Sequence, residues 1–173
     1  MSVRNLPFGT PEKFNVVIEI TQGSQDKYEY DEELDVIKLD RVLYSAQRFP
    51  ANYGFIPETR ADDGDHTDVL LFSTNPLMPG SVATARAIGI MNMIDNGEID
   101  NKIIAVPTED PRFSHVKTLK DIPEHPFKEI RNFFETYKLL QNKIVTVGEF
   151  EDHDKALEYI QKTIEVYKKE HDA

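Results

Sequence analysis

Apolar and polar residues alternate along several short stretches in the first two thirds of the chain, and this spacing predicts β-strands. Within residues 14–20, for example, Phe14, Val16 and Ile18 share one face of the predicted strand. A continuous apolar run over residues 69–72 predicts a buried strand. The other predicted strands cover residues 27–30, 36–43, 49–57, 82–94, 99–106 and 143–147.

Two further signals complete the predicted elements. The pair Asn96-Gly97 separates residues 82–94 from residues 99–106, and Asn-Gly is a strong hairpin signal. Apolar residues then recur at helical spacing, which predicts amphipathic helices over residues 126–141 and 152–171. Many short strands followed by two helices favour a mainly β fold, a small barrel with helices packed outside it. No repeat or linker interrupts residues 1–173, so we expect a single domain.

The composition is acidic but otherwise ordinary for a globular protein. Of the 173 residues, 29% are charged, and the formal net charge is −11 with a sequence pI near 4.9. A broad basic surface for nucleic acid is therefore not expected. The chain has no Cys, which excludes disulfides, and no apolar run of membrane-spanning length. We expect a cytoplasmic protein that binds neither nucleic acid nor a membrane.

The segment before the apolar run of residues 69–72 holds four carboxylates, those of Asp62, Asp63, Asp65 and Asp68. Like charges ~4 Å apart repel by roughly 4 kcal/mol at an effective dielectric constant near 20, so cations are expected among them. Hard oxygen ligands without Cys or clustered His favour Mg²⁺, Mn²⁺ or Ca²⁺. The spacing excludes an EF-hand, because Asp68 stands where that loop requires Gly. A solvated turn is the alternative for this segment taken alone.

Other charged residues on predicted strands and turns have both a structural and a functional interpretation. Glu19 is either an outward charge on a half-buried strand or part of a site. Arg41 lies an even number of residues from Ile37 and Leu39, so all three are expected on the same face of the strand. An Arg on that apolar face needs a buried acidic partner or a bound anion. Tyr53 suits the core as well as a site. The candidate charged residues are Glu19, Glu29, Asp63, Asp65, Asp68, Asp95 and Asp100, with Lys27, Arg41, Lys102 and Lys138.

These residues fall into short blocks that are weak signals singly but specific in this order. The blocks are Val17-Ile18-Glu19-Ile20, Lys27-Tyr28-Glu29, Asp40-Arg41, Asn52-Tyr53-Gly54, Asp63-Gly64-Asp65-His66-Thr67-Asp68, Asp95-x-x-Glu98-x-Asp100-x-Lys102 and Phe133-Phe134-Glu135-x-Tyr137-Lys138. Together they resemble the Family I soluble inorganic pyrophosphatases of the bacterial type. The resemblance implies an OB-like five-stranded β-barrel with two principal flanking helices. It also implies Mg²⁺-dependent hydrolysis of pyrophosphate to two orthophosphates.

The resemblance further implies a role for each candidate residue. Several Mg²⁺ ions would neutralise the substrate and lower the pKa of a water that attacks phosphorus directly, with no phosphoenzyme. Asp65 would be the general base. The implied metal ligands are Glu19, Glu29, Asp63, Asp68, Asp95 and Asp100. The implied phosphate-binding residues are Lys27, Arg41, Tyr53, Lys102, Tyr137 and Lys138. A homohexamer is implied as well, although no pattern in the sequence shows its interface.

The chain departs from the family pattern at His66 and Thr67, where the family has Pro and an aliphatic residue. We expect His66 to be neither a metal ligand nor the base, because its neighbours already supply hard oxygens. Thr67 is expected to replace Val at similar volume, with its hydroxyl bonded locally. Two other classes stay open. One is another metal-dependent phosphoanhydride hydrolase, and the other is a non-enzymatic divalent-cation-binding OB-like module.

Overall fold

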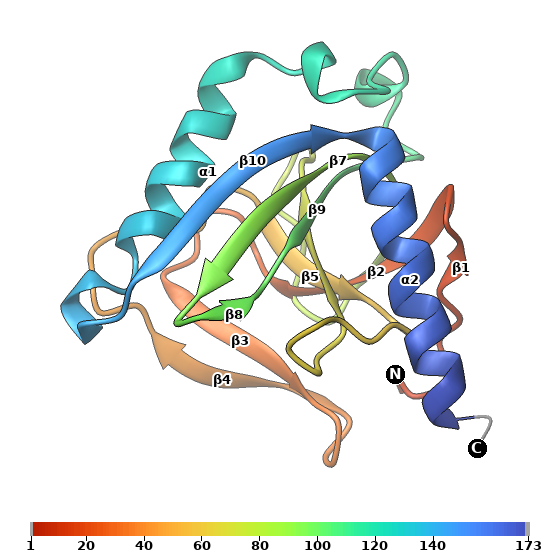
Figure 1. Cartoon of the computed structure of the whole chain (residues 1–173), viewed down its shortest axis with the longest axis horizontal. Helices are drawn as coiled ribbons and strands as arrows, with labels where there is room; N and C mark the ends of the chain where they lie inside the picture. The colour runs from red at the N-terminus through yellow and green to blue at the C-terminus, as the bar shows by residue number, and fades with distance from the viewer. Residues whose placement is uncertain (1, 172–173) are drawn as a thin grey trace.

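Five strands form a closed barrel in the structure, a computed structural model that describes residues 2–171 (Figure 1). Their order around the barrel is β2 (Lys13–Ile20), β5 (Asn52–Ile56), β6 (Thr67–Leu71), β9 (Lys102–Pro107) and β7 (Val82–Asp95). The ring closes because β7 pairs with β2 as well as with β9. Only β6 and β9 are parallel among these pairs. The expected mainly β fold with a five-stranded barrel is therefore confirmed.

The remaining strands extend this sheet or form a separate ribbon. The short strand β1 (Gly9–Thr10) pairs with β2, while β8 (Glu98–Ile99) and β10 (Val145–Asp152) pair with β7. Strands β3 (Asp26–Asp31) and β4 (Val36–Val42) pair only with each other among the described residues, and we call them the β3–β4 ribbon. The ribbon lies at the lower left of Figure 1.

Two helices flank the barrel as expected. Helices α1 (Glu124–Thr136) and α2 (His153–His171) lie on opposite sides of it in Figure 1. Short 3-10 helices cover Pro111–Phe113, Leu119–Asp121 and Leu139–Gln141.

Neighbouring residues of a barrel strand are buried in two different apolar clusters. On β6, Val69 and Leu71 belong to the cluster that includes Ile160 of α2. Leu70 between them belongs to the cluster that includes Phe134 of α1. Burying one such side chain stabilises the fold by ~1.5–3 kcal/mol. Because both faces of β6 are covered, its sequence is a continuous apolar run rather than an alternating one.

Strands β2 and β5 approach each other too closely at Gly54 for any side chain to fit. A Cβ atom there would lie 2.1 Å from the carbonyl oxygen of Val17. A glycine inside a strand often marks such an approach. Beside it the pairing passes from Ile18–Gly54 to Ile20–Tyr53, so Glu19 is an extra, bulged residue of β2.

Some boundaries differ from the sequence expectation. Helix α1 ends at Thr136 rather than at residue 141, and Asn142 closes the following 3-10 turn in a left-handed conformation with φ 56°. The strand expected over residues 143–147 begins at Val145 and continues to Asp152. The expected return strand over residues 99–106 is interrupted after Ile99, so β8 and β9 are separate strands.

Candidate active site

An open cavity of about 470 Å³ lies between the β3–β4 ribbon, residues 63–68 and the end of α1. All residues that the sequence analysis assigned to a site line this cavity. They are Glu19, Lys27, Glu29, Arg41, Tyr53, Asp63, Asp65, Asp68, Asp95, Asp100, Lys102, Tyr137 and Lys138. The structure thus brings every predicted site residue into one place, while their individual roles stay predictions.

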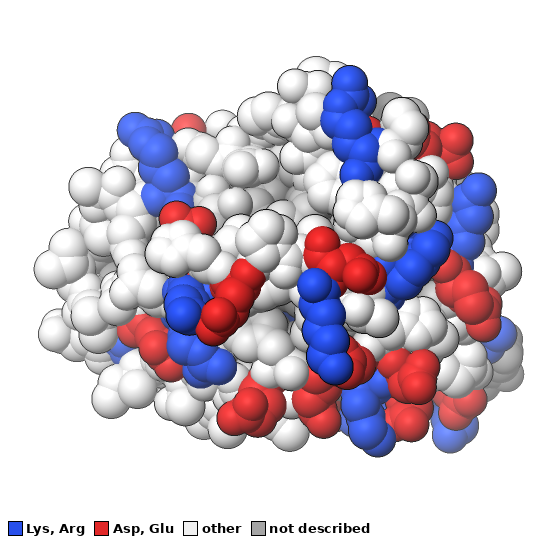
Figure 2. All heavy atoms as spheres, turned by 90° about the horizontal axis from the view of Figure 1, so that it is seen from above, with Lys and Arg blue, Asp and Glu red and all other residues white. Residues whose placement is uncertain are grey.

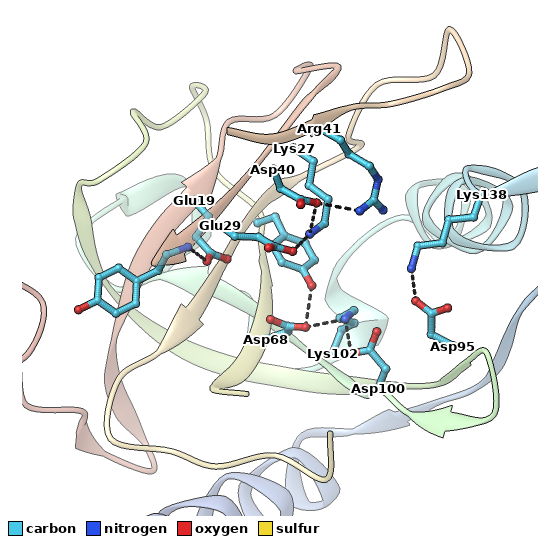
Figure 3. A network of polar contacts seen from close by, with 12 residues as sticks. Glu19, Lys27, Glu29, Asp40, Arg41, Asp68, Asp95, Asp100, Lys102 and Lys138 are labelled. Carbon is cyan, nitrogen blue, oxygen red and sulfur yellow. Dashed lines mark hydrogen bonds and ion pairs between the residues drawn. The ribbon is translucent and has the colours of Figure 1, made fainter. Parts of the chain in front are cut away.

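The parallel pairing of β6 with β9 sets the centre of this cluster. It places Asp68 directly opposite Lys102 in register. The Nζ atom of Lys102 donates hydrogen bonds to Asp68 at 2.6 Å and to Asp100 (Figure 3). The Tyr53 hydroxyl donates to the same Asp68 carboxylate at 2.6 Å. Because Lys102 is only 2% exposed, its charge is tolerated only through these partners.

Burial changes the proton affinities of this central cluster. Burial is the largest influence on Asp68, and with Asp100 it outweighs Lys102 and raises the Asp68 pKa to about 6. Burial alone would lower the pKa of Lys102, but Asp68 and Asp100 together hold it above its ordinary value. One buried amine thus contacts two carboxyl groups in this cluster.

Glu19 reaches the cavity from the bulge in β2. It is 7% exposed, and its Oε1 accepts a hydrogen bond of 2.7 Å from the Tyr30 backbone N–H. Burial, reinforced by the charge of Asp68, raises the pKa of Glu19 to about 8. The interpretation of Glu19 as an ordinary outward charge is therefore wrong. Bulges commonly redirect a side chain in this way, and strict alternation of residues along the sequence does not reveal them.

The acidic loop of residues 61–66 is held by its own backbone and by a nearby Arg. Gly64 has φ 90°, which favours glycine. The Asp65 N–H donates to Asp63 Oδ1 at 3.1 Å, and Arg60 Nη1 donates to the Gly64 carbonyl at 2.7 Å. Burial raises the pKa of both Asp63 and Asp65 above the ordinary range. The fourth carboxylate, Asp62, is not part of the cavity lining.

A second bulge shapes the cationic side of the cavity. Pairing along the β3–β4 ribbon passes from Tyr28–Leu39 to Lys27–Arg41, so Asp40 is the extra residue. Its Oδ2 accepts a hydrogen bond of 2.8 Å from Arg41 and lies 3.5 Å from the Lys27 amine (Figure 3). The Arg41 Nε is buried without a hydrogen-bond partner in the described part of the chain. An unpaired buried donor suits a residue that binds an anion.

The parity expected for Arg41 is only partly correct. Leu39, which was expected on the same buried face, is 49% exposed. The bulge at Asp40 shifts the parity of the strand between Leu39 and Arg41. Asp40 thereby becomes a partner for Arg41, and the sequence analysis had given Asp40 no place in the site.

The remaining cations also contact carboxylates directly. Lys27 pairs with Glu29, and Lys138 pairs with Asp95 (Figure 3). Tyr137 is buried and stacks on Phe133 with ring centres 5.0 Å apart, so this residue belongs both to the core and to the cavity wall. Within residues 2–171 no three carboxylate or imidazole side chains form a ready metal-binding group.

The structure also places residues that the sequence analysis did not assign to the site. The additional lining residues are Tyr30, Glu32, Phe55, His66, Asn96, Glu98 and Lys143. The ring of His66 lies near Thr59 and Glu32, and its expected lack of a metal-binding role stays a prediction. Thr67 is fully buried, but its hydroxyl donates to Thr163 of α2 at 2.9 Å. The expected local bond of Thr67 is therefore wrong.

The outer surface has no continuous basic area on the face drawn in Figure 2, where acidic and basic side chains are interspersed. In the described chain, no helix has both the length and the hydropathy required to cross a membrane.

Comparison with known proteins identifies the family. The family model of inorganic pyrophosphatase matches residues 16–168. The inorganic pyrophosphatase of Halalkalibacterium halodurans is 51% identical over 158 residues, which cover 91% of this chain and 97% of that protein. Soluble inorganic pyrophosphatase 1 of Arabidopsis thaliana is 49% identical over 159 residues, 92% of this chain and 75% of that protein.

Solved structures agree with this result. The crystal structure of inorganic pyrophosphatase from Thermus thermophilus matches with a TM-score of 0.93 and 46% identity, covering 97% of this chain and 99% of that one. The barrel, the flanking helices and the sequence blocks around the cavity therefore have one common explanation: the chain belongs to the inorganic pyrophosphatase family.

Proposed function

We propose that this chain hydrolyses inorganic pyrophosphate to two orthophosphates in the 470 Å³ cavity. The observation that best supports this is the mixture of paired cations and carboxylates around a single cavity. Pyrophosphate is highly charged, and catalysis of phosphoryl transfer consists mainly of positioning and electrostatic stabilisation. A domain that only bound Ca²⁺ would need the carboxylates but not the cations among them, Lys27, Arg41, Lys102 and Lys138.

The acids of the cavity suit a hard divalent cation. Glu19 is buried and Asp68 is half-buried, and their raised pKa values reflect the cost of keeping a carboxylate charged away from water. A bound cation offsets that cost by stabilising the ionised form. The candidate ligands are all carboxylates, which are donors that Mg²⁺ prefers. The proposed ligands are Glu19, Glu29, Asp63, Asp68, Asp95 and Asp100.

When bound, Mg²⁺ would neutralise phosphate oxygens and lower the pKa of a coordinated water. The cationic side chains of the protein would then bind the substrate. The amines of Lys27, Lys102 and Lys138 contact carboxylates in the structure. These amines would become available to phosphate oxygens if the carboxylates held a metal ion instead. Arg41 already has a buried Nε free among the described residues, and Tyr53 and Tyr137 add hydroxyl donors.

Asp65 is the proposed general base. A water oxygen attacks one phosphorus and transfers its proton to the Asp65 carboxylate. The bridging P–O bond breaks, and the leaving phosphate keeps the electron pair of that bond. Burial, reinforced by the charge of Glu29, raises the pKa of Asp65 toward the working pH, which favours its use as a base.

The assembly and location are proposed from the family resemblance. We propose a homohexamer in the cytoplasm. Large apolar side chains are exposed on the single chain, and an interface between subunits would cover such residues. They include Leu34, Tyr44, Met78, Leu139, Leu140 and Ile144.

The first prediction concerns the reaction. With Mg²⁺, the protein should release two phosphates per pyrophosphate and leave ATP largely intact. Asp65→Asn should lower turnover by about 10²–10⁴-fold because Asn cannot accept the proton, while the thermal melt stays unchanged. Asp62→Asn is the matched control, since Asp62 lies outside the cavity and pairs with Lys162. Equal phosphate release by wild type and Asp65→Asn would contradict the assignment of the base.

The second prediction concerns divalent cations. Mg²⁺ at 100 times its Kd should stabilise the folded state by roughly 2.7 kcal/mol through binding to that state alone. Differential scanning fluorimetry with Mg²⁺ and with a chelator measures this as a shift in Tm. Ca²⁺ should also raise Tm but support little turnover, because its longer bonds hold phosphate and water less strictly. If Mg²⁺ does not change Tm, the carboxylates of the cavity do not bind this ion and their role is structural only.

The third prediction concerns pH in the presence of a chelator. The pKa of Glu19 rises from 4.5 to about 8 on folding, so the native state binds a proton that the unfolded state has released. Stability should therefore fall as pH rises from about 4.5 to 8, by up to ~1.4 kcal/mol per pH unit. Urea unfolding at several pH values measures this slope. Asp68, whose pKa is raised to about 6, contributes to the slope below pH 6. Glu19→Gln should therefore flatten the slope between about pH 6 and 8, and an unchanged slope there would rule out Glu19 as its source.

The fourth prediction concerns assembly. Light scattering coupled to gel filtration should give six times the mass of the 19.9 kDa chain. Leu140→Glu would place a charge on an exposed apolar side chain, and it should weaken the assembly if this residue lies at an interface. A monodisperse monomer for the wild type would refute the hexamer.

A further inference from the structure

The acidic loop is a compact turn, and the residues on either side of it, Arg60 and Thr67, are its two stems. Inside the loop, the Ala61 N–H donates to the Asp65 carbonyl at 2.8 Å, and the Gly64 N–H donates to the Ala61 carbonyl at 3.1 Å. These bonds close the turn but do not connect it to the barrel or to a helix. The position of the turn at the cavity therefore depends on what holds its stems.

One residue of helix α2, Thr163, contacts both stems. Its carbonyl oxygen accepts a hydrogen bond of 2.9 Å from the Arg60 backbone N–H. Its hydroxyl oxygen accepts a hydrogen bond of 2.9 Å from the Thr67 hydroxyl. Because Thr67 and Thr163 are both buried, water cannot replace the bond between their hydroxyls. A single helical residue thus holds the chain before and after the acidic loop.

The directions of the hydrogen bonds in this buried group are consistent, because each hydroxyl proton is used once. The Thr163 hydroxyl donates to the carbonyl of Ile160, one turn earlier in α2, at 2.9 Å, so its oxygen is left to accept from Thr67. The Thr59 hydroxyl donates to the Ile56 carbonyl at 2.6 Å and accepts from the Thr67 N–H at 2.8 Å. Thr59 is buried as well. Such fully paired buried groups favour one arrangement of the chain over others.

The bond at Thr67 bears directly on the cavity. Neighbouring residues of a strand point to opposite faces, so Thr67 contacts α2 while Asp68, the next residue, lines the cavity. Asp63 and Asp65 lie between the two stems and line the same cavity. The contact with α2 therefore limits how far these carboxylates can move.

The other contacts between the loop region and α2 lie nearer the surface. Asp62 bonds to Lys162 at 2.7 Å and to the Tyr159 hydroxyl at 3.2 Å, and Arg60 bonds to Glu170 at 3.0 Å. The side chains of Lys162 and Glu170 are 56% and 47% exposed. Exposed ion pairs contribute little, so the buried bonds are the stronger constraint on the loop.

We propose that Thr163 is a positioning residue, which holds both stems of the acidic loop against α2 and so keeps Asp63 and Asp68 in the arrangement that binds a divalent cation. The apparent affinity for a ligand falls with the fraction of molecules in the binding conformation, so a loop held in advance binds more tightly. The inference rests on the proposed function for its catalytic consequence. Thr67, noted in the sequence as a departure from the family, thereby acquires a role in this chain.

The first measurement is thermal stability without metal. Thr163→Val leaves the buried Thr67 hydroxyl without its acceptor, whereas Thr67→Val leaves the Thr163 hydroxyl still bonded to Ile160. The double variant removes both partners and leaves no donor unpaired. A buried donor without a partner costs more than the loss of both partners, so Thr163→Val should lower Tm by about 2–8 °C and the other two variants should lower it less.

The second measurement is Mg²⁺ affinity by titration calorimetry without substrate. Thr67→Val, Thr163→Val and the double variant lose the same bond, so each should weaken Mg²⁺ binding by about two- to tenfold, the ratio equivalent to one hydrogen bond. The double variant should be no weaker than either single variant. Thr163→Ser keeps the hydroxyl and should bind Mg²⁺ like the wild type.

Ile164→Val is the matched control for stability. Ile164 is buried in the same apolar cluster of α2, and the substitution removes one methylene group without removing a hydrogen-bonding group. It should lower Tm but leave Mg²⁺ affinity unchanged. In steady-state kinetics, Thr67→Val should need more Mg²⁺ for half-maximal rate, with little change in kcat at saturating Mg²⁺, because bound metal restores the loop conformation.

The third measurement is hydrogen–deuterium exchange without metal or substrate. Amides of residues 60–67 should exchange faster in Thr67→Val and Thr163→Val than in wild type or Ile164→Val. Amides of the β3–β4 ribbon should be unchanged in all four proteins. This readout does not depend on the reaction that the cavity performs.

Specific results would overturn the role of Thr163. Wild-type Mg²⁺ affinity in Thr67→Val would refute it, as would an equal loss of affinity in Ile164→Val. If Thr163→Val does not fold, Thr67→Val and Thr163→Ser with the control still decide the question. A wild-type protein that binds Mg²⁺ without hydrolysing pyrophosphate would refute the proposed function alone, and one that does not bind Mg²⁺ would refute both.

Discussion

The burial of Lys102 among carboxylates is the constraint on which the rest of the site depends. A charged amine that is 2% exposed must be paired, and removing one partner of a buried pair typically costs about 3–5 kcal/mol. Asp68 is held beside it by the parallel register of β6 and β9, and Asp100 lies in the break between β8 and β9. A register slip of one residue would turn these side chains to the other face. The Asp68–Lys102 contact therefore depends on the pairing of β6 with β9, and burial of Lys102 in that pairing depends on the contact.

The two bulges extend this arrangement to residues that regular strands would direct elsewhere. Glu19 is the extra residue of β2, and Asp40 is the extra residue of β4. The first brings a carboxylate close to Asp68, and the second gives Arg41 an acidic neighbour beside the cavity. Bulges bend a strand and locally change the direction of its side chains. In this protein one bulge brings the Glu19 carboxylate to the cavity, and the other lies next to Arg41, which lines the same cavity.

The sequence predicted the barrel and the residues that line the cavity. It predicted less well how deeply these residues are buried and which partners they contact. The family resemblance carried by the ordered blocks of acids and cations was enough to identify residues that line one cavity. Alternation of apolar and polar residues placed Glu19 on the outer face of its strand. The bulge that brings Glu19 to the cavity has no local signal in the sequence, so it could not be predicted. The end of α1 was missed because Leu139 and Leu140 continue the helical spacing within a 3-10 turn. The partners of His66 and Thr67 are distant in the sequence, so no local pattern could identify them.

The separate ribbon also has a consequence for the way the chain acquires its structure. Asp31 pairs with Val36 across a short turn, whereas the barrel closes only when Val82 pairs with Val17. Pairs close in sequence cost little loop-closure entropy and form quickly, while distant pairs form slowly. During synthesis the two ribbon strands can therefore pair before β7 exists, but such a two-stranded ribbon is only marginally stable until the barrel forms beside it. The cavity has its full set of charges only after Asp100 and Lys138 have been made, so the site is completed well after the ribbon strands are available to pair.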